Sequence, residues 1–470
     1  MFKLTNLFGN KVNVSKDEIA AFLKTDTKAL EAFEEAYNAH TINEGVSDNL
    51  FKINGKQVAE MNAGIRLDTP ESLDSFKQRI VNELISKTVV YSYHNGKSEV
   101  IDLQKKVPDN ELVTSVDIMS LPEEFRPSLT GSLMKVDIPG TGMHLLNLLK
   151  ESMMHKKLAN QKANYHAFRQ GLDILDVDAL TYEIIDRNVN SMGYWIPRMA
   201  GAINEEGFFK IPNTKIIKVP LTILQLTRQD YMSLSKTTLN IVDDYCRKVF
   251  ELKEDKDYFI KTGTYSSKYD FRNARVRGAK EIRELGEYLL FIHWQALQMA
   301  HYNLSGRKQP IIYGVSTTTE WVVRDFIEDV ENNPCIYHGM PLHTEYRAFV
   351  DFDTDTVLGI HPYWDKDVMK KHFDGQEDAD SKHDYIAYSL AEKNLYKRYE
   401  ENKNSVIEHL SLVIPNVEMH GQWSVDIMQN GDDFYFIDMA VAENSAFYAE
   451  SVPVELRNPM KENWIPDLTK

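Results

Sequence analysis

The sequence is poor in cysteine and lacks any long apolar run. Its 470 residues include two cysteines, Cys246 and Cys335, in unrelated contexts. They provide neither a disulfide framework nor a paired Cys/His zinc motif, so a reducing, cytoplasmic location is expected. No stretch approaches the roughly 18 apolar residues of a membrane span. The first residues also lack the apolar core and small-residue cleavage site of a secretory signal. No membrane association is therefore expected.

Basic residues are fewer than acidic residues. Lys and Arg total 54 against 70 Asp and Glu, which gives a formal net charge of −16. Such a surface repels phosphodiester backbones and anionic lipid, so nucleic-acid binding is disfavoured unless a local basic groove overrides the overall charge. With 43% hydrophobic and 26% charged residues the chain is nevertheless typical of globular proteins.

Several common catalytic signatures are missing as well. The sequence has no Walker-type Gly-rich Lys-Ser/Thr motif, no Gly-x-Ser-x-Gly elbow and no His-x-x-x-His pair. It also has no internal repeat. P-loop enzymes, α/β-hydrolases and zinc proteases of the usual kind are thereby disfavoured.

The chain changes character near residue 190. Residues 1–190 are predicted to form an accessory region of unknown role, mainly helical with short strands, including helices over 15–38 and 143–180. In 191–470, strand-like segments alternate with long helices. Two hairpins are predicted there, 344–352 with 357–364 and 423–428 with 434–440. This pattern indicates an α+β fold with antiparallel sheets.

The first segment with chemical potential is FIKTGTYSSKYDF, at 259–271. Lys261 ends an apolar strand, and the following Gly/Ser loop carries Ser266, Ser267 and Lys268. The lysines could bind nucleotide phosphates while backbone N–H groups of residues 263–268 wrap them. The alternative is a strand that ends in a solvated loop.

The second segment is WVVRDFIED, at 321–329. An apolar strand leads into an acidic, aromatic link whose backbone could bind an adenine edge, and whose acids could reach a ribose hydroxyl. The alternative is a buried strand followed by solvated acids. The candidate nucleotide contacts in this link are Asp325, Phe326, Ile327 and Glu328.

The third segment, EYR at 345–347, opens the first hairpin. Glu345 and Arg347 share a face because strand side chains alternate with period two. They could form part of a site or an ordinary ion pair on a sheet surface.

The fourth segment is the acidic hairpin WSVDIMQNGDDFYFIDMA. If its turn is centred on Asp432, Asp426 and Asp438 lie directly opposite each other on one face. Like charges in that arrangement repel, so we expect a compensating cation. Mg²⁺ suits such a carboxylate pair. The alternative is two acids at a solvated sheet end.

The ordered set of segments resembles the ATP-grasp superfamily over residues 195–450. Within it, the set is similar to the cell-division-cycle branch, the assembly chaperone of the eukaryotic trimeric initiation factor. It is also similar to bacterial and phage ATP-grasp proteins suspected of forming amide bonds. The matching stretches are Lys261…Ser266-Ser267-Lys268-Tyr269-Asp270, Glu345-Tyr346-Arg347-Ala348-Phe349-Val350 and Asp426…Ile437-Asp438.

The resemblance implies a two-lobed fold that binds ATP and Mg²⁺ between its lobes. Phosphates would contact Lys261, Lys268 and Arg347, with Lys261 and Arg347 in the catalytic positions. Mg²⁺ would be held by Asp426, Asp438 and a third oxygen ligand. The family's asparagine after the second metal acid is Ala440 here. Nearby Asn444 is the candidate replacement.

Three functions are compatible with these segments. The leading hypothesis is an ATP- and Mg²⁺-dependent ligase that forms an amide-type bond through an acyl-phosphate on an unknown carboxylate, borne by a small molecule or a protein. The second is an ATP-binding assembly factor without ligation. The third is a structural or interaction protein with a vestigial nucleotide site.

Overall fold

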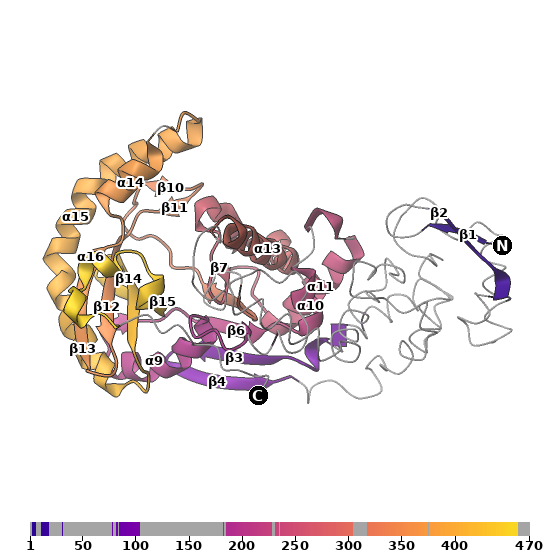
Figure 1. Cartoon of the computed structure of the whole chain (residues 1–470), viewed down its shortest axis with the longest axis horizontal. Coiled ribbons are helices and arrows are strands. Elements are labelled where there is room, and N and C mark those ends of the chain that lie inside the picture. Colours follow the sequence, from indigo (N-terminus) through magenta and orange to yellow (C-terminus); the bar gives the residue numbers. More distant parts are fainter. Residues whose placement is uncertain are drawn as a thin grey trace.

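The computed structural model describes residues 81–103, 185–303, 317–374 and 376–458 with a few short gaps, together with the segments 2–5 and 11–17. Within these residues the chain combines helices with two large, mainly antiparallel sheets, in agreement with the predicted α+β class (Figure 1). None of the helices in this part of the chain has both the length and the apolar character needed to cross a bilayer.

The first large sheet has six antiparallel strands in the order β4-β3-β6-β9-β7-β8. Helices α11 and α13 pack against each other, and α13 contacts β7. The bounds of these elements are β3 (Val89–His94), β4 (Lys97–Asp102), β6 (Thr214–Lys218), β7 (Asp257–Thr262), β8 (Arg275–Arg277), β9 (Glu320–Asp325), α11 (Lys236–Phe250) and α13 (Leu285–Asn303).

The second large sheet has five strands in the order β13-β12-β14-β15-β5, of which β5 runs parallel to β15. Its central strand β14 is buried along its whole length. Helices α9 and α15 cover its apolar face. The bounds are β5 (Phe209–Lys210), β12 (Thr344–Asp351), β13 (Thr356–Pro362), β14 (Gln422–Asn430), β15 (Asp433–Val441), α9 (Met192–Glu206) and α15 (Ala379–Val413).

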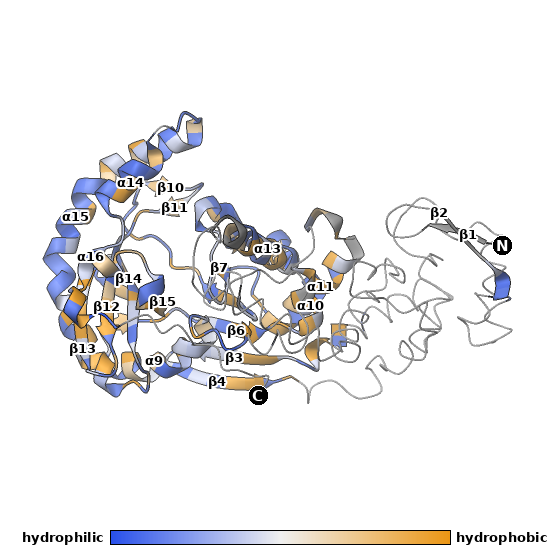
Figure 2. Ribbon diagram, viewed as in Figure 1, coloured by the Kyte–Doolittle hydropathy of each residue, from blue (hydrophilic) through white to orange (hydrophobic). Residues whose placement is uncertain are grey.

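Helix α15 shows why this packing follows from the sequence. The Asp378 side chain accepts a hydrogen bond from the Ser381 amide and caps the helix N-terminus. Its buried residues recur at intervals of three, four and seven, which places them on one stripe. In Figure 2 the helix is mainly hydrophilic in colour, whereas the strands it covers are largely hydrophobic. The stripe consists of Ala387, Tyr388, Ala391, Leu395, Tyr399, Val406, Leu410 and Val413.

The remaining elements are short. They are β1 (Phe2–Thr5) and β2 (Lys11–Val14), which pair with each other, β10 (Cys335–Ile336), β11 (Met340–Pro341), α10 (Leu221–Leu226), α12 (Gly278–Arg283), α14 (Lys366–Phe373) and α16 (Tyr448–Ser451), with 3-10 turns at Tyr231–Ser233, Lys268–Asn273, Ile414–Asn416, Ala442–Asn444 and Val454–Leu456.

Both predicted hairpins are confirmed. β12 pairs with β13 across a turn at residues 352–355, and β14 pairs with β15 across Gly431 and Asp432. The second register places Asp426 directly opposite Asp438, as predicted, with an irregularity immediately after Asp426.

Part of the N-terminal region joins the first sheet. β3 pairs with β6 from Val90↔Ile217 to Tyr93↔Thr214, so residues 89–102 share one sheet with strands that follow residue 190. The helices predicted over 15–38 and 143–180 lie almost entirely outside the described residues. The division of the chain near residue 190 stays a prediction.

Candidate functional site

A cavity of about 930 Å³, including its open mouth, lies between the two large sheets. Side chains of β7 and β9 line one side, side chains of β12, β14 and β15 line the other, and the links at 266–271 and 326–343 complete the wall. The structure brings the following predicted residues together in this lining: Lys261, Ser266, Lys268, Asp325, Phe326, Ile327, Asp426 and Asp438.

The two opposed carboxylates each have a protein cation. Arg347 donates to Asp426 through Nε and Nη2, at 2.8 and 2.7 Å. Lys261 reaches across from the other sheet, with Nζ 2.8 Å from Oδ2 of Asp438. In this structure Arg347 and Lys261 provide charges that offset the repulsion of this pair, and the assignment of Mg²⁺ to it stays a prediction.

Lys261 is the more deeply placed of these cations. Its side chain is 3% exposed, whereas that of Arg347 is 14% exposed. The Asp438 side chain with which it pairs is 38% exposed. β7 and β9 place it on the cavity side of their sheet, opposite Val322. A buried ammonium requires a carboxylate or another acceptor, so this lysine is held at the centre of the cavity wall.

Lys268 is a second cation of the cavity lining. Its ammonium donates to the Tyr363 hydroxyl and lies 4.5 Å from the centroid of that ring. The Arg347 guanidinium lies over the same ring, at 4.6 Å. Two of the predicted phosphate ligands, Lys268 and Arg347, therefore contact the Tyr363 ring. Arg347 itself is not among the residues that line the cavity. A small shift of either side chain would present its charge to an anion there.

Glu345 also lines the cavity, beside Lys268 and Asp426. Burial raises the pKa of its carboxyl to about 7, and the nearby Lys268 charge only partly offsets that effect. The site therefore contains a carboxyl group that is half protonated near neutral pH.

Arg324 is a cavity residue that the sequence interpretation missed. Its guanidinium leaves β9 and donates to the carbonyls of Ile437 and Phe436 on β15, at 2.6 and 3.2 Å. Burial lowers its pKa to about 10, so it stays charged at neutral pH. Arg324 thereby ties the two sheets together beside Asp438. Its signal in the sequence was a charge inside an apolar run, in WVVRDFI.

Other lining residues were also not predicted. Most are apolar or aromatic, as expected of a small-molecule cavity, and they would surround a flat ring system. They are Pro212, Phe259, Phe271, Met340, Pro341, His343, Tyr363, Trp364, Met428 and Ile437.

The two acids that were predicted to contact ribose already have partners within the protein. Asp325 accepts a hydrogen bond from Asn213 at 2.8 Å, and Lys256 lies 3.6 Å from the same oxygen. Glu328 is 67% exposed on its side chain and lies 3.3 Å from Arg275. Asp325 borders the cavity, whereas Glu328 is not among its lining residues.

Two further predicted residues lie outside the lining. The Ser267 hydroxyl donates to the side-chain oxygen of Gln295 on helix α13, at 2.8 Å. Asn444 faces Asn190, whose amide donates to its side-chain oxygen at 3.4 Å. Neither residue is part of the cavity lining in this structure.

The loop after Lys261 is tightly hydrogen-bonded. Gly263 N–H donates to the Glu320 carbonyl at 3.0 Å, and Tyr265 N–H donates to the Thr262 hydroxyl at 2.9 Å. A Cβ at Gly263 would lie 2.5 Å from the Thr318 hydroxyl oxygen, so close packing requires this glycine. Two of the backbone N–H groups of residues 263–268 are thus bonded within the protein in this conformation, and the wrapping of phosphates by this loop stays a prediction.

No family model and no curated protein matches the sequence. Among solved structures, C-terminally truncated Cdc123 from Schizosaccharomyces pombe is 13% identical, with a TM-score of 0.32 over 60% of this chain and 95% of the other. Cdc123 from the same organism is 11% identical, with a TM-score of 0.32 over 59% and 95%. A likeness of this degree establishes neither a family nor a function.

The raised pKa of Glu345 leads to a pH prediction. Between about pH 4.5 and 7 the folded protein keeps this proton while the unfolded chain loses it, so Glu345 lowers stability as pH rises through that window. Glu345→Gln removes the effect. Relative to wild type, the variant should gain on the order of 1–3 kcal/mol between pH 5 and 8. Urea unfolding at both pH values measures the difference.

A matched control for this experiment is Glu400→Gln, at a surface glutamate that is 60% exposed and pairs with Lys403. It should shift stability equally at both pH values. An equal shift for Glu345→Gln as well would contradict the assignment of a protonated carboxyl to the cavity.

Proposed function

We propose that this protein binds Mg²⁺-ATP in the cavity between its two large sheets and acts as a nucleotide-bound assembly factor, without consuming ATP in ligation. The nucleotide would lie between two ATP-grasp-like lobes. Lys261, Lys268 and Arg347 would contact its phosphates, and Asp426 and Asp438 would hold Mg²⁺. The base would lie among the aromatic lining residues, along the 325–328 link.

The observation that carries this proposal is the convergence of cations from several elements around one cavity. Lys261 comes from the first sheet and Lys268 from the loop that follows it, while Arg347 comes from the second sheet and pairs with Asp426. Arg324 adds a third cation to the lining itself, beside the carboxyl groups of Asp325, Glu345, Asp426 and Asp438. In a chain with net charge −16, cations gathered around one cavity offer charge-assisted hydrogen bonds to an anionic ligand.

The same contacts suggest how the ligand is received. Lys261 and Arg347 each neutralise one aspartate in this conformation. Phosphate oxygens would compete for the two cations, and each carboxylate released in this way would become a ligand for Mg²⁺, which prefers carboxylate and phosphate oxygens. Nucleotide and metal binding would therefore be coupled.

Binding without turnover is preferred because of the third metal ligand. Phosphoryl transfer is commonly supported by two metal ions that bridge the phosphates. Ala440 offers no ligand at the family's asparagine position, and Asn444 faces Asn190 instead of the cavity. These residues fit one Mg²⁺ better than two. The assembly-factor class itself rests on the sequence resemblance.

A ligase that works through an acyl-phosphate is the second candidate. The observation in its favour is Arg347, a cation beside the proposed metal carboxylates, where it could stabilise a transferred phosphoryl group. Its substrate would be a carboxylate on a small molecule or a protein.

One experiment separates these functions. Full-length protein is heated with and without millimolar Mg²⁺-ATP, and ADP release is followed in parallel with a panel of carboxylates and amines. We expect a rise in melting temperature, since a ligand that binds only the folded state stabilises it by mass action. We expect no sustained ADP release. Steady turnover with any pair would establish the ligase, and the lack of any thermal shift would favour the interaction protein with a vestigial site.

A further inference from the structure

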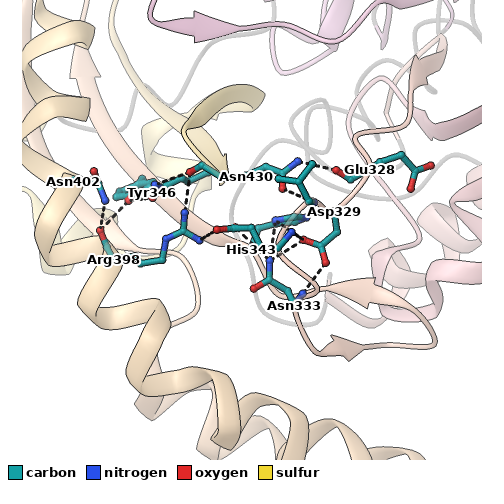
Figure 3. Close-up of polar contacts among 12 residues, drawn as sticks. Glu328, Asp329, Asn333, His343, Tyr346, Arg398, Asn402 and Asn430 are labelled. Carbon is teal, nitrogen blue, oxygen red and sulfur yellow. Dashed lines mark hydrogen bonds and ion pairs between the residues drawn. The ribbon is translucent and has the colours of Figure 1, made fainter.

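The link between β9 and β12 contains a second group of potential metal ligands. Asp329, Glu331 and His343 each contribute one donor atom, and these atoms all lie within 4.8 Å of one another. Figure 3 shows Asp329 and His343 side by side in this link, with Asn333 next to them. This group belongs to neither the Asp426–Asp438 pair nor any of the predicted nucleotide contacts. Its donor set combines an imidazole nitrogen with carboxylate oxygens.

Surrounding contacts hold both carboxylates in place. Oδ2 of Asp329 accepts a hydrogen bond from the backbone N–H of Asn333 at 2.7 Å, and Oδ1, on the His343 side, accepts one from the backbone N–H of Glu331 at 3.1 Å. Oε1 of Glu331 is paired with Arg398, which in turn donates to the Gly431 carbonyl at 2.9 Å. Outer partners that hold ligating carboxylates in a fixed orientation are characteristic of protein metal sites.

Asn333 supplies a fourth polar group at the centre. Its side-chain Nδ2 donates to Oδ1 of Asp329 at 3.0 Å and to Oε2 of Glu331 at 3.5 Å, and it lies 3.4 Å from Nδ1 of His343. The nitrogen and oxygen of an amide are assigned, not observed, and a flip exchanges them. With the oxygen inward, these separations match those of ligands that share one cation with bonds of roughly 2.1 Å.

The imidazole is suited to ligation. His343 is 4% exposed, and its Nδ1 lies 3.9 Å from Oδ1 of Asp329, too far for a hydrogen bond. Burial lowers its pKa, which keeps the ring neutral at pH 7. Among the described residues, the full cation paired with this group is Arg398, which pairs with Glu331, so two carboxylates and one guanidinium leave a net negative charge.

We propose that Asp329, Glu331, Asn333 and His343 form a binding site for a divalent transition metal, for which Zn²⁺ is the reference ion. Imidazole with carboxylate and amide oxygens favours Zn²⁺ or Mn²⁺ over Mg²⁺. The metal would fix the 326–343 link, which joins the two sheets and places Pro341 and His343 in the cavity wall. Its role would be to hold the link in place, independently of nucleotide.

The test uses full-length protein that is stripped with EDTA, loaded with one equivalent of Zn²⁺ and dialysed. Bound metal is measured by mass spectrometry, and melting temperature is measured in parallel. We expect about one Zn²⁺ per chain and a rise in melting temperature that EDTA reverses. Glu331→Gln and Asp329→Asn should each weaken Zn²⁺ binding at least 10-fold in a calorimetric titration.

Two control variants guard against other causes. Cys335→Ser removes a thiol whose sulfur lies 3.8 Å from the Asn333 carbonyl, and Asp365→Asn alters another carboxylate beside a histidine, His361. Both should retain wild-type Zn²⁺ binding. If Asp329→Asn fails to fold, Glu331→Gln, whose side chain is 22% exposed, carries the test. Absence of bound Zn²⁺ in the wild type, or equal binding by wild type and Glu331→Gln, would overturn the proposal.

Discussion

Replacement of Arg347 by methionine is expected to lower the free energy of unfolding by about 2–4 kcal/mol. Arg347 and Asp426 form a two-bond pair whose side chains are only 14% and 11% exposed. Removal of the guanidinium leaves Asp426 buried, without its cation and directly opposite Asp438. A carboxylate in that position loses its partner and faces a like charge, which is the costly case for a buried pair. Urea unfolding followed by tryptophan fluorescence measures the loss.

The matched control is the double variant Arg347→Met with Asp426→Asn, which removes both charges. Because the two residues form one pair, the double variant should be less destabilised than the sum of the two single variants. Additive losses would show that Arg347 and Asp426 act independently and would contradict the pairing as the source of the effect.

Asp438→Asn is expected to remove the Mg²⁺-dependent part of ATP binding, weakening affinity roughly 30-fold or more, about 2 kcal/mol. An asparagine retains the shape of the side chain and one oxygen but lacks the charge that holds the metal. In EDTA, where no Mg²⁺ is bound, the variant should bind ATP within a few-fold of wild type. Calorimetric titrations with and without Mg²⁺ give both affinities.

The same variant should also be less stable than wild type without ligand. The Lys261 ammonium, 3% exposed, loses the carboxylate that lies 2.8 Å away. Lys261→Met combined with Asp438→Asn should restore part of that stability, since no charge is then left buried. If Asp438→Asn lowers stability but leaves Mg²⁺-ATP affinity intact, Asp438 is only a structural partner of Lys261 and the metal assignment is wrong.

Local patterns predicted the second sheet well. Each hairpin brings together neighbouring segments, and in the acidic hairpin the turn at Gly431 and Asp432 sets which residues face each other. Counting back from that turn alone would pair Asp426 with Ile437; the irregularity between Asp426 and Ile427 shifts the register by one residue and produces the opposition of Asp426 and Asp438 that a turn centred on Asp432 predicted. The shared face of Glu345 and Arg347 followed from strand alternation.

Contacts between distant segments could not be predicted in this way. Lys261 and Asp438 are 177 positions apart, and Arg324 reaches carbonyls more than 110 positions away. Nothing in the local periodicity of either partner specifies such a pairing. Sequence reasoning therefore assigned to a metal the charge compensation that Lys261 and Arg347 provide.

Strand alternation also explains the position of Asp325. It follows Arg324 on β9, so the two side chains leave the sheet on opposite faces. Arg324 reaches the second sheet across the cavity, whereas Asp325 bonds to Asn213. Lys261 faces the cavity and pairs with Val322 in the register, so Val322 lies on the same face of the sheet. Arg324 is two residues after Val322 and therefore also lies on the cavity face.

The central proposal is that the cavity between the sheets binds Mg²⁺-ATP through Lys261. Its most direct test is a calorimetric titration of ATP, in Mg²⁺, into full-length wild type, Lys261→Met and the surface control Lys397→Met, whose side chain is 70% exposed. The proposal predicts saturable binding at one site in wild type and Lys397→Met, and binding at least 10-fold weaker in Lys261→Met. Absence of binding to wild type at millimolar ATP, or equal affinity for all three proteins, would contradict it.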